Sequence, residues 1–382
     1  MAATTDGCFK ILRESYERAL KHLDQPFPTD KKILKCIETV TLCLRNRAGV
    51  RALLACALAK IDKSKLDIRK PYTDIAGDDG TTSYSGRAYD ETYLDVLKEN
   101  PYDLPINATT AFLTPGFRTK NITLSRDVEL EGRPAEMYEA FLHLLDDIHK
   151  GRVSAETVMD ETMRLLILER NKGKAAIEEL LKDILHTGDR LPLSVEDTVT
   201  LLHQHLECKN SSRLPVLIVA AAYRTAQDRI GERVLHLHPH NAADRQTGAA
   251  GDIEITLIND DNVATAYEMK MKVVTVGDIN RAVEKVKRDK QSIQHYVFVT
   301  TDQIDKDVKE YAAGLYEQLG GTEIAILDCL GFISHFLHVF HRLRTEFLNT
   351  YQKLLLAEPD SAVSHTLKQA FLTLRKAAEG AN

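Results

Sequence analysis

The sequence predicts a protein of the α/β (α+β) class, in which a mixed sheet is flanked by helices and both ends of the chain are largely helical. Three observations predict it. Apolar residues recur at three- and four-residue spacing near both ends. Residues 214–327 alternate between helical and strand patterns in the order α-β-β-α-β-α-β. The 382 residues, 43% of them apolar, suffice for two to three domains and exclude a wholly disordered chain.

Each element is predicted from its own pattern, and Ser194-x-x-Asp197 resembles a capping box at the start of one helix. In chain order, helices are expected over residues 31–44, 48–60, 154–170, 174–185, 194–207, 214–230, 279–293, 306–319, 331–356 and 361–378. Strands are expected over residues 252–258, 265–275, 296–301 and 323–327, where apolar residues run together or alternate with polar ones.

Changes in composition divide the chain into five segments. The helical region 1–65 is followed by a region, 66–135, whose Gly, Asp, Asn and Pro content indicates long loops. A second helical region, 136–210, precedes the α/β region 211–330 and the C-terminal helices 331–382. In that last segment His335, His338 and His341 recur at helical spacing among apolar residues, which favours a packed helix and a candidate dimer contact.

The composition also limits the setting of the protein. The longest apolar stretch, residues 215–223, is far shorter than the roughly 20 residues of a spanning helix. The first residues lack the pattern of a secretory signal, and six scattered cysteines are typical of reduced thiols, so we expect a cytoplasmic protein without a membrane partner. With 56 acidic and 50 basic side chains it is no generic polyanion binder, although a local cleft can still be basic.

The most informative residues lie in the first two expected strands of the α/β region. Asp252 and Glu254 alternate with apolar residues in one strand, and Glu268 and Lys270 do so in the next. A hairpin turn over residues 259–262 folds the pair about residue 260, which sets Asp252 opposite Glu268, with Lys270 one step along the same face. The sequence alone does not fix this register, and an error of one residue would spoil the alignment.

Such a group has a clear chemical use. Two carboxylates bind Mg²⁺, which lowers the pKa of a bound water, and a neighbouring lysine holds developing negative charge. Gly248 and Gly251, which lack side chains, would let a DNA backbone approach closely. Phosphodiester hydrolysis is the reaction class that follows, whereas the alternative is a solvated polar strand face without function.

A resemblance supports the catalytic interpretation. Asp252, followed by Glu268-x-Lys270 and framed by the helices 214–230 and 279–293, resembles the core of PD-(D/E)XK nucleases. The stretch NAADRQTGAAGDIEI is similar to the approach to the catalytic Asp in type II restriction endonucleases. YSGRAYDE and LPINATTAFLTPGFR, upstream, resemble the SacI family of these enzymes. The resemblance spans roughly residues 66–330 and implies a PD-(D/E)XK restriction-endonuclease-like core over residues 211–330.

The resemblance also implies roles for particular residues. Asp252 and Glu268 would be metal ligands together with the backbone carbonyl of Met269, and Lys270 would be the catalytic lysine. Glu254 is a candidate additional acid, with solvated strand decoration as the alternative. The implied cofactor is Mg²⁺, with Mn²⁺ as a substitute.

Several polar side chains are candidate DNA contacts, because Arg pairs with guanine, Asn with adenine, and Thr with bases or phosphate. They are Arg87, Asn107, Thr109, Arg118, Lys120 and Asn121 in the loop-rich region, and Arg281 and Lys285 on the helix after the second strand. The alternatives are turn chemistry for the loop residues and a solvated charged face for the helix. His236, His238 and His240 alternate as zinc ligands could, but no cysteine or carboxylate set completes a site.

The expected function is that of a type II restriction endonuclease that cuts both strands of double-stranded DNA at a short palindrome. A twofold-symmetric target favours a homodimer. The resemblance implies GAGCTC as the default target and a methyltransferase of the same system as functional partner. The alternatives are a PD-(D/E)XK nuclease of a repair or multi-subunit defence complex, and a catalytically silent DNA-binding protein.

Overall fold

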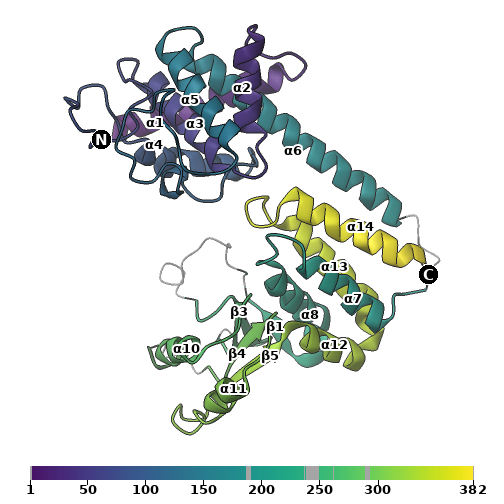
Figure 1. Ribbon diagram of the computed structural model, residues 1–382. Coiled ribbons are helices and arrows are strands. Elements are labelled where there is room, and N and C mark those ends of the chain that lie inside the picture. Colours follow the sequence, from purple (N-terminus) through teal and green to yellow (C-terminus); the bar gives the residue numbers. More distant parts are fainter. Residues whose placement is uncertain are drawn as a thin grey trace. The chain divides into compact units, whose positions relative to one another are not determined.

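The computed structural model describes residues 2–185, 191–235, 237, 249–260, 262–288 and 293–381 (Figure 1). The chain forms two compact units. The N-terminal unit comprises Met1–Ala175 and Pro359–Ser361, and the C-terminal unit comprises Ala176–Glu358 and Ala362–Asn382. The first two segments expected from composition fall in the N-terminal unit, the third is divided between the two units, and nearly all the rest lies in the C-terminal unit.

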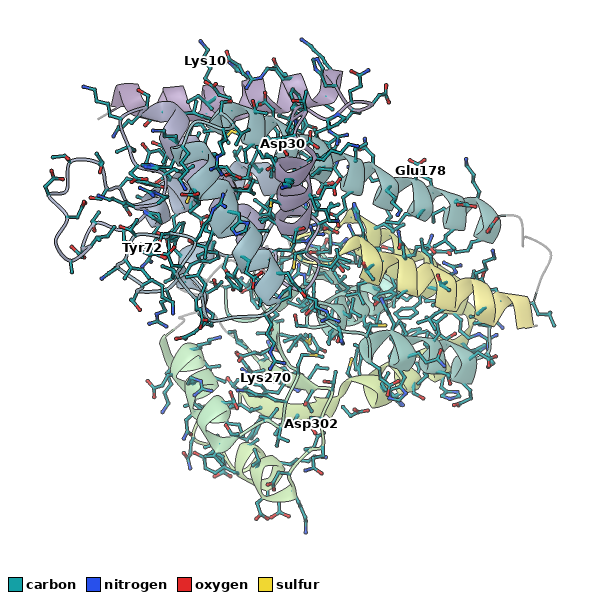
Figure 2. The ribbon with its side chains drawn as sticks, turned by 45° about the horizontal axis from the view of Figure 1, so that its top comes forward. Lys10, Asp30, Tyr72, Glu178, Lys270 and Asp302 are labelled. Atoms are coloured by element: carbon teal, nitrogen blue, oxygen red, sulfur yellow. The ribbon has the colours of Figure 1, made fainter. Side chains whose placement is uncertain are left out.

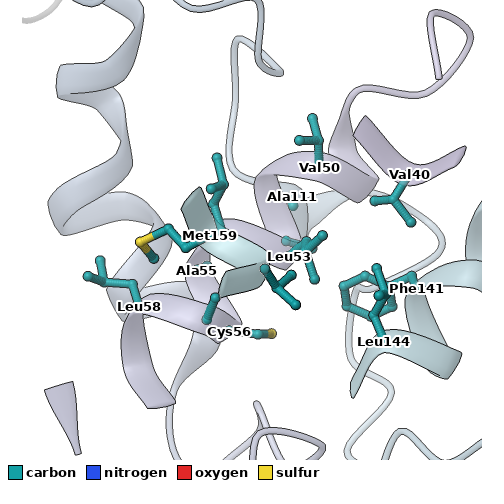
Figure 3. Packing of buried hydrophobic residues seen from close by; sticks show 14 of the residues in the cluster. Val40, Val50, Leu53, Ala55, Cys56, Leu58, Ala111, Phe141, Leu144 and Met159 are labelled. Carbon is teal, nitrogen blue, oxygen red and sulfur yellow. The ribbon is translucent and has the colours of Figure 1, made fainter. Parts of the chain in front are cut away.

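The N-terminal unit is helical and is built around one buried helix. Its elements are α1 (Ala2–Lys21), α2 (Lys31–Thr41), α3 (Ala48–Asp62), α4 (Gly86–Tyr93), η1 (Leu94–Lys98), η2 (Ala111–Leu113), α5 (Ala135–His149) and the first part of α6 (Ala155–Leu185). Every residue of α3 from Ala48 to Ala59 is buried, and the helix packs against α1, α2, α4 and α5. Figure 3 shows this core, which includes Leu53 and Cys56 of α3, Phe141 and Leu144 of α5, and Met159 of α6.

α6 differs from the prediction of two separate helices, because it runs without a break from Ala155 to Leu185. The predicted break falls at Asn171–Gly173, two residue types that favour turns. A glycine inside a helix costs only about 1 kcal/mol relative to alanine. The periodic apolar side chains on both sides of the break outweigh that cost.

A buried arginine fastens the loop-rich segment to α3. The Arg51 side chain is buried and donates to the carboxylates of Asp90 and Asp95, the latter at 2.7 Å, and to the backbone carbonyl of Asn107 at 2.8 Å. The Asp90 carboxylate also accepts from the Thr110 hydroxyl at 2.8 Å. These contacts hold α4 and the residues just before η2 against α3. The loops of the segment are therefore anchored to the helical core.

The C-terminal unit is an α/β structure with a five-stranded mixed sheet. Its elements are α7 (Val195–Leu206), α8 (Leu214–Ile230), β1 (Glu232–Val234), β2 (Ile253–Leu257), β3 (Thr265–Lys270), α10 (Val276–Arg288), β4 (His295–Thr300), α11 (Lys306–Ala313), β5 (Glu323–Asp328), α12 (Cys329–Val339), η3 (His341–Leu343), α13 (Arg344–Ala357) and α14 (His365–Ala381). The strands lie in the order β1-β2-β3-β4-β5, antiparallel from β1 to β3 and parallel from β3 to β5. The predicted α/β class is confirmed.

The two faces of the sheet are covered by different helices (Figure 1). Ile255 and Val297 belong to the core that the sheet forms with α7, α8, α12, α13 and α14. Ala266 and Phe298 belong to the smaller core on the other face, which α10 and α11 cover. Side chains of β2 that lie on the same face of the strand as Asp252 therefore point toward α10 and α11.

Most predicted boundaries agree with the structure to within a few residues, but α11 ends at Ala313, six residues before its predicted end, and the helix predicted over residues 331–356 is divided into α12, η3 and α13. α8 is found as predicted, and the capping box of Ser194 with Asp197 is present. β3 ends at Lys270, five residues before its predicted end, because α10 already begins at Val276. The three-residue strand β1 was not predicted, since so short a run carries no periodic signal.

A buried histidine in the C-terminal unit predicts pH-dependent stability. The His205 ring lies 3.0 Å from both the Tyr351 hydroxyl and the Leu367 carbonyl, and burial lowers its pKa from 6.5 to about 4. Because only the unfolded chain takes up a proton between those values, this stability is complete above pH 6.5 and is lost as the pH falls toward 4. We expect the free energy of unfolding to drop by about 2 kcal/mol between pH 7.5 and 5 from this residue alone.

Urea unfolding at the two pH values measures the effect, with His205→Gln as the matched variant. Glutamine keeps a donor for the Leu367 carbonyl but does not titrate. The variant should lose about 2 kcal/mol less than the wild type on acidification. An equal loss in both proteins would contradict this origin.

Candidate active site

The predicted hairpin register is present in the structure. β2 and β3 pair with Ile253 opposite Tyr267 and Ile255 opposite Thr265, which continues to Asp252 opposite Glu268. The Asp252 carboxylate accepts a hydrogen bond of 2.7 Å from the backbone N–H of Met269. The two carboxylates expected to act together are thus at directly opposed positions at one end of the hairpin. The turn that joins the strands is described except for Asp261.

Three side-chain donors contact the Glu268 carboxylate. Its Oε1 lies 2.6 Å from the Lys270 ammonium, and its Oε2 lies 3.1 Å from the Lys285 ammonium and accepts from the Tyr296 hydroxyl. Burial opposes ionisation of Glu268, but these donors and the two positive charges hold its pKa below the ordinary value. Glu268 is therefore ionised at neutral pH, as a metal ligand must be.

Lys270, labelled in Figure 2, is the last residue of β3 and contacts a second carboxylate, which sequence patterns did not assign to the site. Its Nζ lies 3.3 Å from Oδ1 of Asp278, in the first turn of α10. Burial disfavours the charged lysine, but Glu268 and Asp278 together raise its pKa above the ordinary value. The spacing Thr275-x-x-Asp278 is a capping-box pattern and was the one available signal for Asp278, although it predicts only a helix start.

Asp278 is itself almost fully buried, with 2% of its surface exposed. Its Oδ2 accepts from the Thr275 backbone N–H at 3.0 Å and hydroxyl at 2.6 Å, and its Oδ1 lies 2.5 Å from Arg281. Burial opposes its ionisation, but the Thr275 hydrogen bonds and the charges of Lys270 and Arg281 hold its pKa well below the ordinary value. Five charged side chains thus alternate in sign: Arg281, Asp278, Lys270, Glu268 and Lys285.

The loop before Asp252 is packed against β3 through Gly251. A Cβ added at Gly251 would lie 2.5 Å from the backbone oxygen of Tyr267, so no side chain fits there. Close contact with β3 is thus a structural reason for this glycine, and the approach of DNA that the sequence suggested stays a prediction. Gly248 lies outside the described residues. Glu254 accepts from the Ala250 backbone N–H at 2.7 Å and so supports the same loop.

Replacing this glycine should damage the hairpin. In Gly251→Ala the new methyl group meets backbone that cannot move aside, so β2 and β3 separate where Asp252 faces Glu268. We expect a loss of about 1–3 kcal/mol in unfolding free energy, measured by urea denaturation. Gly277→Ala, inside α10, is the matched control, because its Cβ meets nothing closer than 3.6 Å. A Gly251→Ala protein as stable as that control would contradict the clash.

The donor set at this site fits Mg²⁺. Asp252 and Glu268 supply carboxylate oxygens at facing positions, Met269 follows Glu268 directly in the chain and supplies a backbone carbonyl, and hard cations prefer such oxygen ligands. In the described part of the chain no group of three or more His, Cys, Asp or Glu side chains could hold a metal ion. A cation here would therefore be held by two carboxylates, a carbonyl and water. His236, His238 and His240 lie outside the described residues.

The structure places the candidate DNA contacts in two groups. In the N-terminal unit, three of them make local contacts: Arg87 pairs with Glu91 at 2.8 Å, the Asn107 side chain donates to the Thr109 carbonyl at 2.8 Å, and Lys120 lies 3.5 Å from Glu131. Thr109, Arg118 and Asn121 are exposed. In the C-terminal unit, Lys285 lies against Glu268 while Arg281 is 67% exposed beside Asp278.

Comparison with known proteins bears on the class of this site. Residues 190–301 match the family model of the SacI restriction endonuclease C-terminal domain. The matched stretch contains α7 through β4, and so includes Asp252, Glu268 and Lys270. It supports a restriction endonuclease, that is, a nuclease that binds DNA. No curated protein matches the chain. Within the described residues, no helix has the length and apolar character needed to cross a membrane.

Proposed function

We propose that this protein is a Mg²⁺-dependent type II restriction endonuclease with a PD-(D/E)XK core similar to the SacI family. One observation carries the proposal. Inside the stretch that matches the restriction endonuclease family, Asp252 faces Glu268 across the hairpin, and the Lys270 ammonium lies 2.6 Å from the Glu268 carboxylate. Two facing carboxylates can hold a divalent cation, and an adjacent lysine can stabilise negative charge, so the group suits metal-assisted phosphodiester hydrolysis.

The protein groups have separate tasks in this reaction. Asp252, Glu268 and the Met269 carbonyl would hold Mg²⁺, with Mn²⁺ as a substitute. The bound ion supplies Lewis acidity and makes hydroxide available from water near neutral pH. Lys270 orients the attacking water and stabilises negative charge on the scissile phosphate. Because lysines and Tyr296 contact both oxygens of Glu268, cation binding requires a rearrangement of these contacts. The products carry a 5′-phosphate and a 3′-hydroxyl.

The target and assembly follow from symmetry. Cleavage of both strands at a palindrome is matched by a homodimer with one site for each strand, and GAGCTC is the first sequence to test. α12 offers a candidate contact surface, since Val339 at its end is 56% exposed. A methyltransferase that protects the same sequence would complete the system.

Digestion of unmethylated phage DNA by the purified protein with Mg²⁺ tests the proposal. We expect discrete fragments whose sequenced ends share one palindrome, and no cleavage with EDTA. Lys270→Ala should abolish cutting but retain specific binding. Absence of cleavage, or random nicking insensitive to both EDTA and Lys270→Ala, would overturn the proposal in favour of a binding protein or a nuclease that needs a partner subunit.

A further inference from the structure

We propose that Asp278 is a positioning residue for Lys270, which it holds in place when Glu268 turns to other partners. This inference rests on the proposed nuclease function and extends it to a residue outside the Asp252, Glu268 and Lys270 set. Two carboxylates contact the Lys270 ammonium: that of Glu268 at 2.6 Å and that of Asp278 at 3.3 Å.

The two oxygens of Asp278 are divided between two tasks. Oδ2 alone accepts both hydrogen bonds from Thr275, and the Asp278 backbone N–H returns one to the Thr275 hydroxyl at 3.2 Å, which completes the cap of α10. Oδ1 makes no part of the cap and instead faces Lys270 and Arg281. A residue needed only as a cap would not require this second oxygen.

Burial makes the contact rigid. Asp278 is 2% exposed and is fixed by the start of α10, whereas Glu268 is a longer side chain shared among Lys270, Lys285 and Tyr296. If Glu268 binds a cation, its oxygens turn to that cation and its contact with Lys270 weakens. Asp278 then supplies the carboxylate that holds the ammonium in position. Partners behind the reacting residues typically contribute 10- to 100-fold to metal affinity or activity.

Three variants separate the positioning task from the capping task. Asp278→Asn retains an oxygen for the cap but removes the charge near Lys270. Asp278→Glu keeps both functions, because Glu is a usual residue at this position of a capping box. Thr275→Val removes the hydroxyl from the cap and leaves the Asp278 charge in place.

Steady-state DNA cleavage over a range of DNA concentrations gives the first readout. We expect Asp278→Asn to lower kcat about 10- to 100-fold with KM within about threefold of the wild type. Asp278→Glu should restore kcat to within about tenfold, and Thr275→Val should lower the melting temperature without that fall in kcat. A kcat of Asp278→Asn within threefold of the wild type would overturn the proposal, as would an equal fall in Thr275→Val.

The second readout does not need catalysis. In metal-free protein carrying ¹⁵N-lysine, the Lys270 ammonium resonance, assigned with Lys270→Arg, should be visible in the wild type and broadened in Asp278→Asn. An unchanged resonance would contradict a positioning role. If the wild type fails to cleave DNA, the nuclease proposal fails, but this measurement still decides whether Asp278 holds Lys270.

Discussion

Asp252→Asn should reduce the rate of DNA cleavage at least about a thousandfold while leaving DNA binding intact. The substitution keeps the shape of the side chain and an oxygen that can accept from the Met269 N–H, but it removes the negative charge facing Glu268. Stabilisation of transition-state charge by a bound metal is worth several kcal/mol, and about 4 kcal/mol corresponds to a thousandfold in rate. Single-turnover cleavage with Mg²⁺ measures the rate, and gel shift with Ca²⁺ in place of Mg²⁺ measures binding.

Asp260→Asn is the matched control for this experiment. Asp260 lies in the turn of the same hairpin, is exposed, and accepts from the backbone N–H of Asn262 at 3.0 Å, a contact that asparagine can keep. Like Asp252→Asn, the substitution removes one negative charge, but at a position away from the paired carboxylates. The variant should therefore cleave DNA at a rate within about twofold of the wild type. Equal activity of Asp252→Asn and Asp260→Asn would remove Asp252 from the proposed metal site.

Arg51→Met should destabilise the protein by about 3–5 kcal/mol, the largest effect we expect away from the site. The substitution leaves Asp90 fully buried without its cation, and desolvation already raises the pKa of Asp90 despite Arg51. It also removes donors to the carboxylate of Asp95 and the carbonyl of Asn107. Urea unfolding followed by circular dichroism measures the loss, and proteolysis should cut first in the loop-rich segment.

Two further variants define the cause of that loss. Asp90→Asn combined with Arg51→Met removes the uncompensated charge and should recover part of the stability. Arg87→Gln breaks an exposed ion pair with Glu91 and should change stability by less than about 1 kcal/mol. An Arg51→Met protein no less stable than Arg87→Gln would refute a structural role for the buried network.

The sequence by itself determined the elements and the hairpin of the candidate site. Apolar periodicity located α8, and a polar four-residue turn centred near residue 260 between two alternating strands suggested the pairing of Asp252 with Glu268, while the register itself came from the structure. Both are local signals: side chains in a strand alternate with a period of two, and a short turn leaves few ways to pair the strands. The family match includes this hairpin but does not extend to the loop-rich segment, where similarity to the SacI family was also expected.

The side chains that contact this hairpin from other elements could be identified only in the tertiary structure. Asp278 and Lys285 reach Lys270 and Glu268 from α10, and Tyr296 does so from β4, through contacts that depend on how the helix packs across the sheet. In the sequence, Asp278 indicated no more than a helix cap, and Gly251 suggested room for DNA rather than close packing on Tyr267. Spacing along the chain encodes local conformation, whereas burial and partners are set by segments distant in sequence, and these decide the charge and position of each side chain.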